Sequence, residues 1–361
     1  MSKPFRLADH IDEVEFLKKA VEATKLSAVM DLLSMLPIVD EESYLFDDHS
    51  PETGWTPGKL HWYGVGGERL NAGRIKQAGS AENPIAERLV NAMEGVIELH
   101  RRRELLANPN SPAPENPRAA VKRYFDLPPL DQLPAWPTDI RGLKPKKYSR
   151  EVAKLIRAKL LREKKGKYTI IVEDDGIGQT PSHLHSTLLS LGSSDKGDKP
   201  YLIGVFGQGG SSAYAASEMS WLMSRRAPDL VSTDDDRGVG WTIVKHIFPK
   251  GRRDDFYVYL AASPDGTVPF FSAKAADQAG ITNGTRIAHV NYDFGKSEPA
   301  RTLFSSLNHL LFNPVLPYEL STGPDRAVDP MSGNAYRLSN LPAEKKSLDK
   351  HFEPQSVNAP G

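Results

Sequence analysis

Apolar residues recur at helical spacing in three segments of this chain, and each segment carries a residue that marks a helix end. The first segment runs from about Ala8 to Leu36 and stops at Pro37. The second, from about Asn83 to Leu105, opens with an N-cap followed by proline. The third, Arg150 to Lys164, follows a capping serine. The apolar faces of these predicted helices are Val14, Leu17, Ala20 and Val21; Ile85, Leu89, Ala92, Val96 and Leu99; and Val152, Leu155, Ile156 and Leu160.

Strand-like runs dominate the second half of the chain. Short loops join most of them, which predicts antiparallel pairing because parallel pairs need long crossovers. Helices come mainly before strands, and this order favours a two-layer α+β sandwich. The predicted strands are Tyr168 to Val172, Met219 to Ser224, Val239 to Ile247, Phe256 to Ala261 and Thr285 to Val290.

The other segments lack a clear period. Asp40 to Ser80 is irregular, and the proline-rich stretch from Ala107 to Lys147 reads as an inserted loop rather than core. Small residues from Ser211 to Ser217 suit a helix packed closely on a neighbour. The tail after Asn313 is turn-rich and has no predicted closing element.

Composition narrows the class of protein. The chain has 361 residues, 39% of them hydrophobic, which suffices for one large core or two domains. Its formal net charge is zero, so bulk charge predicts neither a nucleic-acid nor a membrane partner. The absence of cysteine excludes disulfides and thiolate zinc sites. The polar N-terminus and the lack of a long apolar stretch predict a cytoplasmic protein that does not enter the membrane.

The stretch Val172-Glu173-Asp174-Asp175-Gly176-Ile177-Gly178 is a first candidate for chemistry. It places an acidic side chain at the end of a predicted strand, beside backbone that two glycines leave bare. That arrangement suits recognition of an amine on a ligand that approaches the main chain. Acidic turns ending in glycine are common, so the weight of this motif depends on its neighbours.

Glu87 and Asn91 are a second candidate, because residues four apart lie on one face of the second helix. A carboxylate can accept a proton from water while a carboxamide oxygen ligates Mg²⁺. Glu94 lies on the neighbouring turn. The alternative is an ordinary solvated helix face.

A glycine-rich run follows, with Gly204, Gly207, Gly209 and Gly210 leading into Ser211. Bare backbone N–H groups at a helix start attract anions. The alternative is a flexible glycine loop.

In order and internal spacing, four motifs resemble those of the GHKL ATPase superfamily, which includes gyrase B subunits, heat-shock chaperones, MutL, MORC proteins and histidine kinases. The similarity covers about residues 81 to 292, and the lid motif around Lys196 is most similar to the MORC and MutL versions. The resemblance implies the Bergerat fold, in which helices cover one face of a mixed, mostly antiparallel sheet. The four motifs are Glu87-x-x-x-Asn91, Asp174-x-Gly176-x-Gly178, Gly204-x-x-Gly207-x-Gly209 and Gly284-Thr285.

The resemblance also implies roles for these residues. Asp174 would accept a hydrogen bond from the adenine amino group of ATP, with Thr285 helping through water, and Gly176 and Gly178 would let base and sugar approach. Glu87 would deprotonate the attacking water, and Asn91 would coordinate Mg²⁺. Residues 179 to 210 would form the ATP lid. The implied phosphate contacts are Lys196, Gly204, Gly207, Gln208, Gly209, Gly210 and Ser211.

The resemblance implies an ATP-driven conformational machine that dimerises when ATP binds. Residues 1–80 would be an N-terminal extension serving as a dimerisation strap, 81–292 the ATP-binding domain, and 293–361 the start of a transducer-like region. Glu94 stands where many relatives have aspartate, and the gap between Asn91 and Asp174 is longer than in most of them. The cation that a transducer domain supplies to the γ-phosphate has no assigned residue, and the chain is expected to be a fragment of a longer protein.

Two alternatives remain open. One is phosphotransfer of the histidine-kinase type, for which His10 is the nearest candidate, although the charged, proline-containing box that should follow it is missing. The other is a binding module without significant turnover. The basic stretch Arg141 to Lys167 would then contact DNA phosphates, unless it is only the solvated face of an amphipathic helix.

Overall fold

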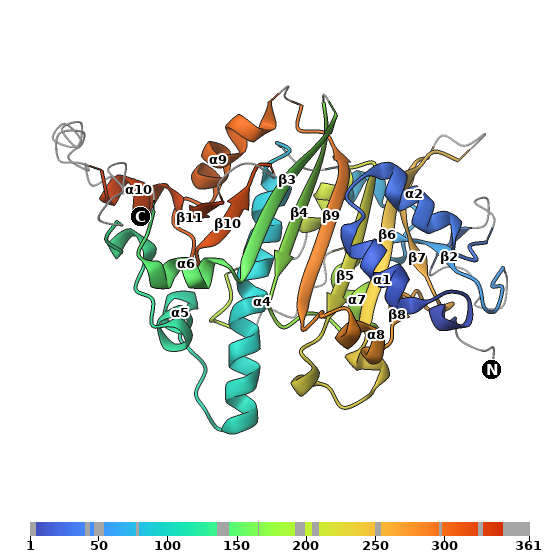
Figure 1. Ribbon diagram of the computed structural model, residues 1–361, viewed down its shortest axis with the longest axis horizontal. Coiled ribbons are helices and arrows are strands. Elements are labelled where there is room, and N and C mark those ends of the chain that lie inside the picture. Colours follow the sequence, from blue (N-terminus) through green and yellow to red (C-terminus); the bar gives the residue numbers. More distant parts are fainter. Residues whose placement is uncertain are drawn as a thin grey trace, which may run out of the picture.

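A single sheet forms the centre of the molecule, as the computed structural model in Figure 1 shows. The structure describes residues 5–39, 44–46, 54–76, 79–135, 144–164, 166–191, 199–203, 209–249, 254–295, 298–323 and 328–341. Within these residues the sheet has eleven strands, in the order β1-β2-β7-β6-β5-β9-β4-β3-β10-β11, with β8 paired to β6. The bounds are β1 Tyr44–Leu45, β2 His61–Gly64, β3 Ile156–Lys164, β4 Lys167–Asp174, β5 Met219–Arg225, β6 Val239–Ile247, β7 Phe256–Ala261, β8 Phe270–Phe271, β9 Gly284–Tyr292, β10 Tyr318–Ser321 and β11 Asp329–Met331.

Most neighbouring strands run antiparallel, as the short loops predicted. The strands β5, β6 and β7 pair in sequence order. Strand β9 enters between β4 and β5, although it follows β5, β6 and β7 in the chain. Two pairs are parallel, β1 with β2 and β3 with β10. The sheet is therefore mixed, in an α+β arrangement.

Helices cover both faces of this sheet. The helices α1 (Glu13–Glu22), α2 (Leu26–Ser34) and α8 (Ala273–Gln278) pack on one face, and α4 (Asn83–Ala107) crosses the other, behind the sheet in Figure 1. Ile171 of β4 packs toward α1 and α2, whereas Ile170 and Val172 pack toward α4. The prediction of helices on one face only is wrong, because β4 is apolar on both sides and needs cover on both.

The remaining helices are short, apart from α9. They comprise the helices α3 Ala72–Ile75, α5 Pro117–Phe125, α6 Lys147–Ala153, α7 Leu184–Thr187, α9 Pro299–Leu310 and α10 Gly333–Ser339, and the 3-10 helices η1 Leu7–Asp9, η2 Val65–Gly67, η3 Leu130–Gln132, η4 Gly209–Tyr214, η5 Pro228–Leu230 and η6 Asp235–Arg237. Among the described residues, no helix is both long and apolar enough to cross a bilayer.

Two of the three predicted helices differ from the structure. The segment Ala8–Leu36 is interrupted, because Ala23 to Lys25 are extended or turn-like between α1 and α2. The segment Arg150–Lys164 is wrong as a helix: it contains the end of α6 and then β3, which pairs with β4 from Ile156 opposite Asp174. Ile156, Ala158 and Leu160 are buried at alternate positions. The sequence of this segment therefore also fits the two-residue period of a strand.

The proline-rich stretch after α4 is part of the core rather than only a surface loop. Its side chains Ala120, Val121 and Leu127 are buried against α4 and the sheet. The hydroxyl of Tyr124 donates to Glu104 of α4 at 2.7 Å, which ties α5 to that helix. The prediction of an inserted loop outside the core is therefore wrong.

The tail after Asn313 also contains ordered elements. Strand β10 continues the sheet beyond β3, with Leu320 opposite Ala158. Helix α10 packs on η3 and α9, and its Tyr336 is buried against Leu130 and Leu133. The prediction that no element closes the tail is wrong. The sheet thus extends past residue 292, and the proposed division at that point stays a prediction.

Candidate functional site

The acidic turn lies at the end of β4, directly under α4. Asp174 is the last residue of the strand and stands opposite Thr285 of β9. Its Oδ1 accepts a hydrogen bond of 2.9 Å from the backbone N–H of Gly176. The side chain is thereby held at the strand end, where the sequence motif placed it.

Backbone of α4 packs directly on this turn. The N–H of Ile177 donates to the carbonyl of Gly95 at 2.8 Å. A Cβ at Gly176 would lie 2.6 Å from the carbonyl carbon of Gly95, closer than packed atoms allow. Sequence reasoning missed Gly95, although a lone glycine inside a strongly helical segment is a known signal of close packing.

Backbone conformation and packing also require glycine at position 178. Its φ is +65°, and a Cβ there would lie 1.8 Å from the carbonyl oxygen of Arg225. Packing within the protein thus accounts for Gly176 and Gly178. Their role toward a base or sugar stays a prediction.

Hydroxyl groups from two neighbouring strands, β5 and β9, meet beside Asp174 of β4. The Oγ1 of Thr285 and the Oγ of Ser224 on β5 are 2.9 Å apart, and the N–H of Gln179 donates to Ser224 at 2.8 Å. Ser224 and Thr285 are cross-strand partners, as are Thr285 and Asp174. Ser224 was missed because only the order β5-β9-β4 makes it a neighbour of the acidic turn.

The two neighbouring carboxyl groups differ in their surroundings. Burial raises the pKa of Asp174 to about 7, although backbone N–H groups of Gly176 and Thr285 lower it. Asp175 instead turns to Arg157 of β3, whose two terminal nitrogens lie 2.7 and 2.9 Å from its oxygens. Asp175 is therefore committed to an ion pair, whereas the hydrogen bonds that Asp174 accepts come from backbone N–H groups.

Glu87 and Asn91 lie on α4, and both side chains are exposed. Glu94, one turn farther, is buried and accepts from the backbone N–H of Ile203 at 2.9 Å. Glu98 binds the hydroxyl of Tyr201 at 2.8 Å and continues the same side of the helix. The acidic residues of α4 thus hold the segment 199–203 next to the Glu87–Asn91 pair.

The glycine-rich run is described only in part. Gly209, Gly210 and Ser211 begin η4, which packs against α4. Lys196, Gly204, Gly207 and Gln208 lie outside the described residues. The structure thus brings one end of the predicted phosphate-binding run to α4.

Mg²⁺ would find oxygen ligands here but no complete protein cage. The described residues contain no cluster of three His, Asp or Glu side chains that could hold a metal ion. Magnesium usually keeps one or two protein ligands and takes the rest from phosphates and water. The exposed carboxamide of Asn91 and carboxylate of Glu87 fit that requirement.

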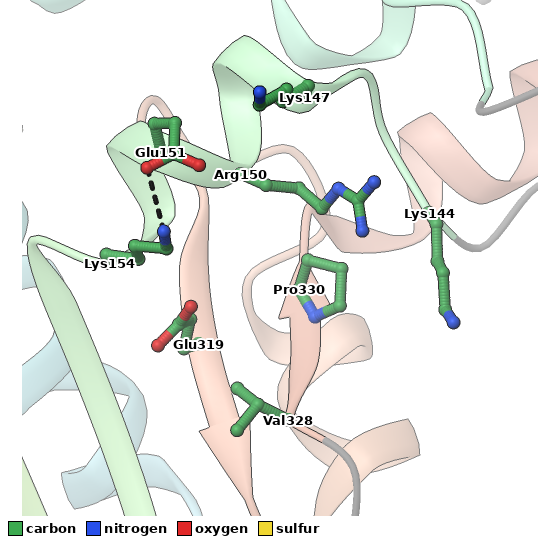
Figure 2. Close-up of a pocket in the computed structure, with 8 residues that line it drawn as sticks. All are labelled: Lys144, Lys147, Arg150, Glu151, Lys154, Glu319, Val328 and Pro330. Carbon is green, nitrogen blue, oxygen red and sulfur yellow. Dashed lines mark hydrogen bonds and ion pairs between the residues drawn. The ribbon is translucent and has the colours of Figure 1, made fainter.

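The basic stretch Arg141–Lys167 divides into two groups, while Arg141 and Lys165 lie outside the described residues. On β3, Arg157 pairs with Asp175, and Lys159 pairs with Glu173 at 2.8 Å. The second group surrounds α6 and faces β10 and β11 across a cavity of about 360 Å³ (Figure 2). Its lining residues are Lys144, Lys147, Arg150, Glu151, Lys154, Glu319, Val328 and Pro330.

No protein-family model matches the chain, and a search of the curated proteins finds no match either.

Proposed function

We propose that this chain binds ATP with Mg²⁺ between the turn at Asp174 and α4, and hydrolyses it. The observation that carries the proposal is the position of Asp174, a half-buried carboxyl at a strand end, beneath the helix whose exposed face bears Glu87 and Asn91. A half-buried carboxyl selects a ligand with a donor, because any of its acceptor positions that lose water without gaining a partner are costly. The Bergerat fold and membership of the GHKL superfamily belong to the same proposal.

The roles follow from the chemistry of each side chain. Asp174 accepts the hydrogen bond of an exocyclic amine, and the hydroxyls of Thr285 and Ser224 hold water beside it. Asn91 would hold Mg²⁺, which offsets phosphate charge when bound. Glu87 takes the proton of the attacking water. Lid closure and ATP-dependent dimerisation remain predictions of the family resemblance.

The adenine assignment is tested with Asp174→Asn. The amide can keep the bond from Gly176, but it presents a donor toward the ligand's donor. We expect affinity for ATP and for adenosine to fall about tenfold or more in calorimetric titration. Asp175→Asn is the matched control, because its carboxylate faces Arg157, and its affinities should match those of the wild type. Equal losses in both variants would remove the assignment.

The hydrolytic role is tested with Glu87→Ala. Loss of a general base should lower turnover by about two orders of magnitude while ATP binding stays intact. Glu15→Ala, an exposed acid on α1, controls for a general change of charge. Turnover unchanged in Glu87→Ala, with ATP still bound, would favour a different base. Binding without turnover in the wild type would favour the nucleotide-gated binding module instead, and phosphate transferred to His10 the kinase alternative.

A second function, binding of DNA phosphates, is favoured by the cavity beside α6. Four cations, Lys144, Lys147, Arg150 and Lys154, line it against only two carboxylates, and Glu151 already pairs with Lys154 at 2.8 Å. DNA affinity that falls with salt, and less steeply after Lys147→Gln, would support phosphate contacts there. An affinity insensitive to salt would exclude them.

A further inference from the structure

Arg88 is a buried arginine, and two of its three guanidinium nitrogens lack a hydrogen-bond partner among the described residues. Its side chain is 5% exposed, and its Nε and Nη2 have no hydrogen-bond partner among the described residues. The nearest compensation is the ring of Tyr214, whose centroid lies 5.2 Å from the guanidinium carbon. A cation–π contact offsets only part of the cost of removing a charged guanidinium from water. The position is therefore unfavourable for folding by itself.

The surroundings of Arg88 do not supply a balancing charge from the sheet. His289 of β9 lies nearby, and burial together with the charge of Arg88 holds the pKa of His289 well below its usual value. His289 is thus a neutral neighbour whose Nδ1 is engaged by Ser220 at 2.7 Å. Neither His289 nor Ser220 therefore supplies a charge that balances the guanidinium.

The guanidinium packs closely against the start of η4. A Cβ added to Gly210 would lie 3.0 Å from Nη1 of Arg88. Because Gly210 has no side chain, the guanidinium lies directly against the backbone of η4. An anion bound along that backbone would therefore lie next to the positive charge of Arg88.

The spacing along α4 matches the two ends of a nucleotide. Arg88 and Gly95 are seven residues apart, so they lie on nearly the same face of the helix and are separated by about 10 Å. Gly95 contacts the turn of Asp174, the end proposed for adenine. Asn91 lies between them along the helix. An extended nucleotide that begins at Asp174 would carry its phosphates toward Arg88 and Gly210.

We infer that Arg88 binds the polyphosphate of the nucleotide from beneath Gly210, and so supplies a cation from α4 itself. This inference rests on the proposed ATP site and identifies Arg88 as the residue that binds the charged end of the nucleotide. A planar guanidinium with free donors can bind phosphate oxygens in pairs, and bound phosphate would satisfy the atoms that are now without partners. Arg88 differs in this from Glu87, which acts on water.

The test is a calorimetric titration of wild type, Arg88→Met and Arg88→Lys with ATP and with adenosine. Arg88→Met should lose about tenfold or more in affinity for ATP and keep its affinity for adenosine, because adenosine has no phosphate. Arg88→Lys should lie between, since it keeps the charge but not the paired donors. The ATP affinity of wild type should also fall more steeply with salt than that of Arg88→Met.

Arg301→Met is the matched control, because it removes an exposed arginine from α9 and should leave both affinities unchanged. An equal loss of affinity for ATP and adenosine in Arg88→Met would show that Arg88 has a structural role and would overturn the inference. Unchanged affinity for ATP in this variant would overturn it as well. If wild type bound neither ligand, the proposed function would fail, and tripolyphosphate would then test Arg88 alone. Thermal stabilisation by tripolyphosphate in wild type but not in Arg88→Met would uphold an anion site, and its absence would refute one.

Discussion

Arg88 and Arg225 are both buried arginines on elements that touch the acidic turn, but the protein satisfies only one of them. Arg225, at the end of β5, is 3% exposed. Its Nε donates to the carbonyl of Arg237 at 2.9 Å, its Nη2 binds Asp277 at 2.8 Å, and its Nη1 donates to the carbonyl of Ile281. Arg88 is 5% exposed and has no such set of partners.

The difference separates a structural arginine from one held for a ligand. A buried charge is tolerated when hydrogen bonds and ion pairs compensate for the hydration that it loses. Arg225 meets that condition within the protein, so the site region depends on it for folding. Arg88 would meet that condition only with a bound anion, which is why we assign Arg88 to binding phosphate.

The largest effect should come from Arg225→Met. This change leaves the carbonyls of Arg237 and Ile281 without their donor, so we expect unfolding free energy to fall by about 2–4 kcal/mol. Urea denaturation measures it, with Arg301→Met as a reference within about 0.5 kcal/mol of wild type. A loss no greater than that of the reference would mean that the bonds around Arg225 contribute little.

A second prediction extends the comparison to carboxyl groups. Burial raises the pKa of Asp174 to about 7, above its unfolded value of about 4, so the folded state retains a proton that the unfolded state releases. The protein therefore loses stability as pH rises from about 4 to about 7, and the loss is complete above that range. Asp174→Asn should therefore stabilise the ligand-free protein more at about pH 8 than at about pH 5, by roughly 1–3 kcal/mol. Thermal or urea unfolding at the two pH values measures this difference. An equal effect at both would contradict a raised pKa.

Glu104 is the satisfied counterpart of Asp174. Although burial raises its pKa, hydrogen bonds from Tyr124, Arg101 and Ser111 lower it to about 2. Its stabilising effect is present above its unfolded pKa and is lost as pH falls toward 2. Glu104→Gln should thus destabilise by about 1–2 kcal/mol near neutral pH, a value reduced by solvent screening, and by less in acid. Acid denaturation curves of the two proteins would show it, and parallel curves would speak against it.

The smallest effect on stability should come from Arg88→Met. Removing a buried guanidinium without partners leaves no acceptor unsatisfied, so unfolding free energy in the absence of nucleotide should stay within about 1 kcal/mol of wild type or rise. The same urea denaturation used for Arg225→Met measures it. A loss as large as that of Arg225→Met would erase the contrast between the two arginines.

Sequence patterns predicted the elements that carry strong, single periods. The helix at Asn83 to Leu105 is α4, and the predicted strands match β4, β5, β6, β7 and β9. The segment Arg150–Lys164 failed because its residues satisfy a helical and an alternating pattern at once. Pairing with β4 and β10 on either side decided in favour of the strand, an interaction that local pattern does not contain.

The candidate site divides in the same way. Asp174, Glu87 and Asn91 were found from residue type and spacing, and the structure places Asp174 under the helix that bears the other two. Gly95 and Arg88 were passed over, although a glycine within the helix and an arginine in line with Ala92, Val96 and Leu99 on its apolar stripe were visible signals. Ser224 could not be found at all, since it becomes a neighbour of Asp174 only through the late entry of β9.

The sequence alone determined that an acidic strand end, a long helix with a polar face and a mostly antiparallel sheet would be present, because these follow from local period and turn chemistry. The tertiary structure decided which side chains meet. It covered both faces of the sheet and paired Asp175, but not Asp174, with Arg157. It also buried Arg88 beside Gly210, with Nε and Nη2 unpaired among the described residues. Burial and pairing depend on contacts between residues far apart in the chain, and it is these contacts that distinguish a structural charge from a functional one.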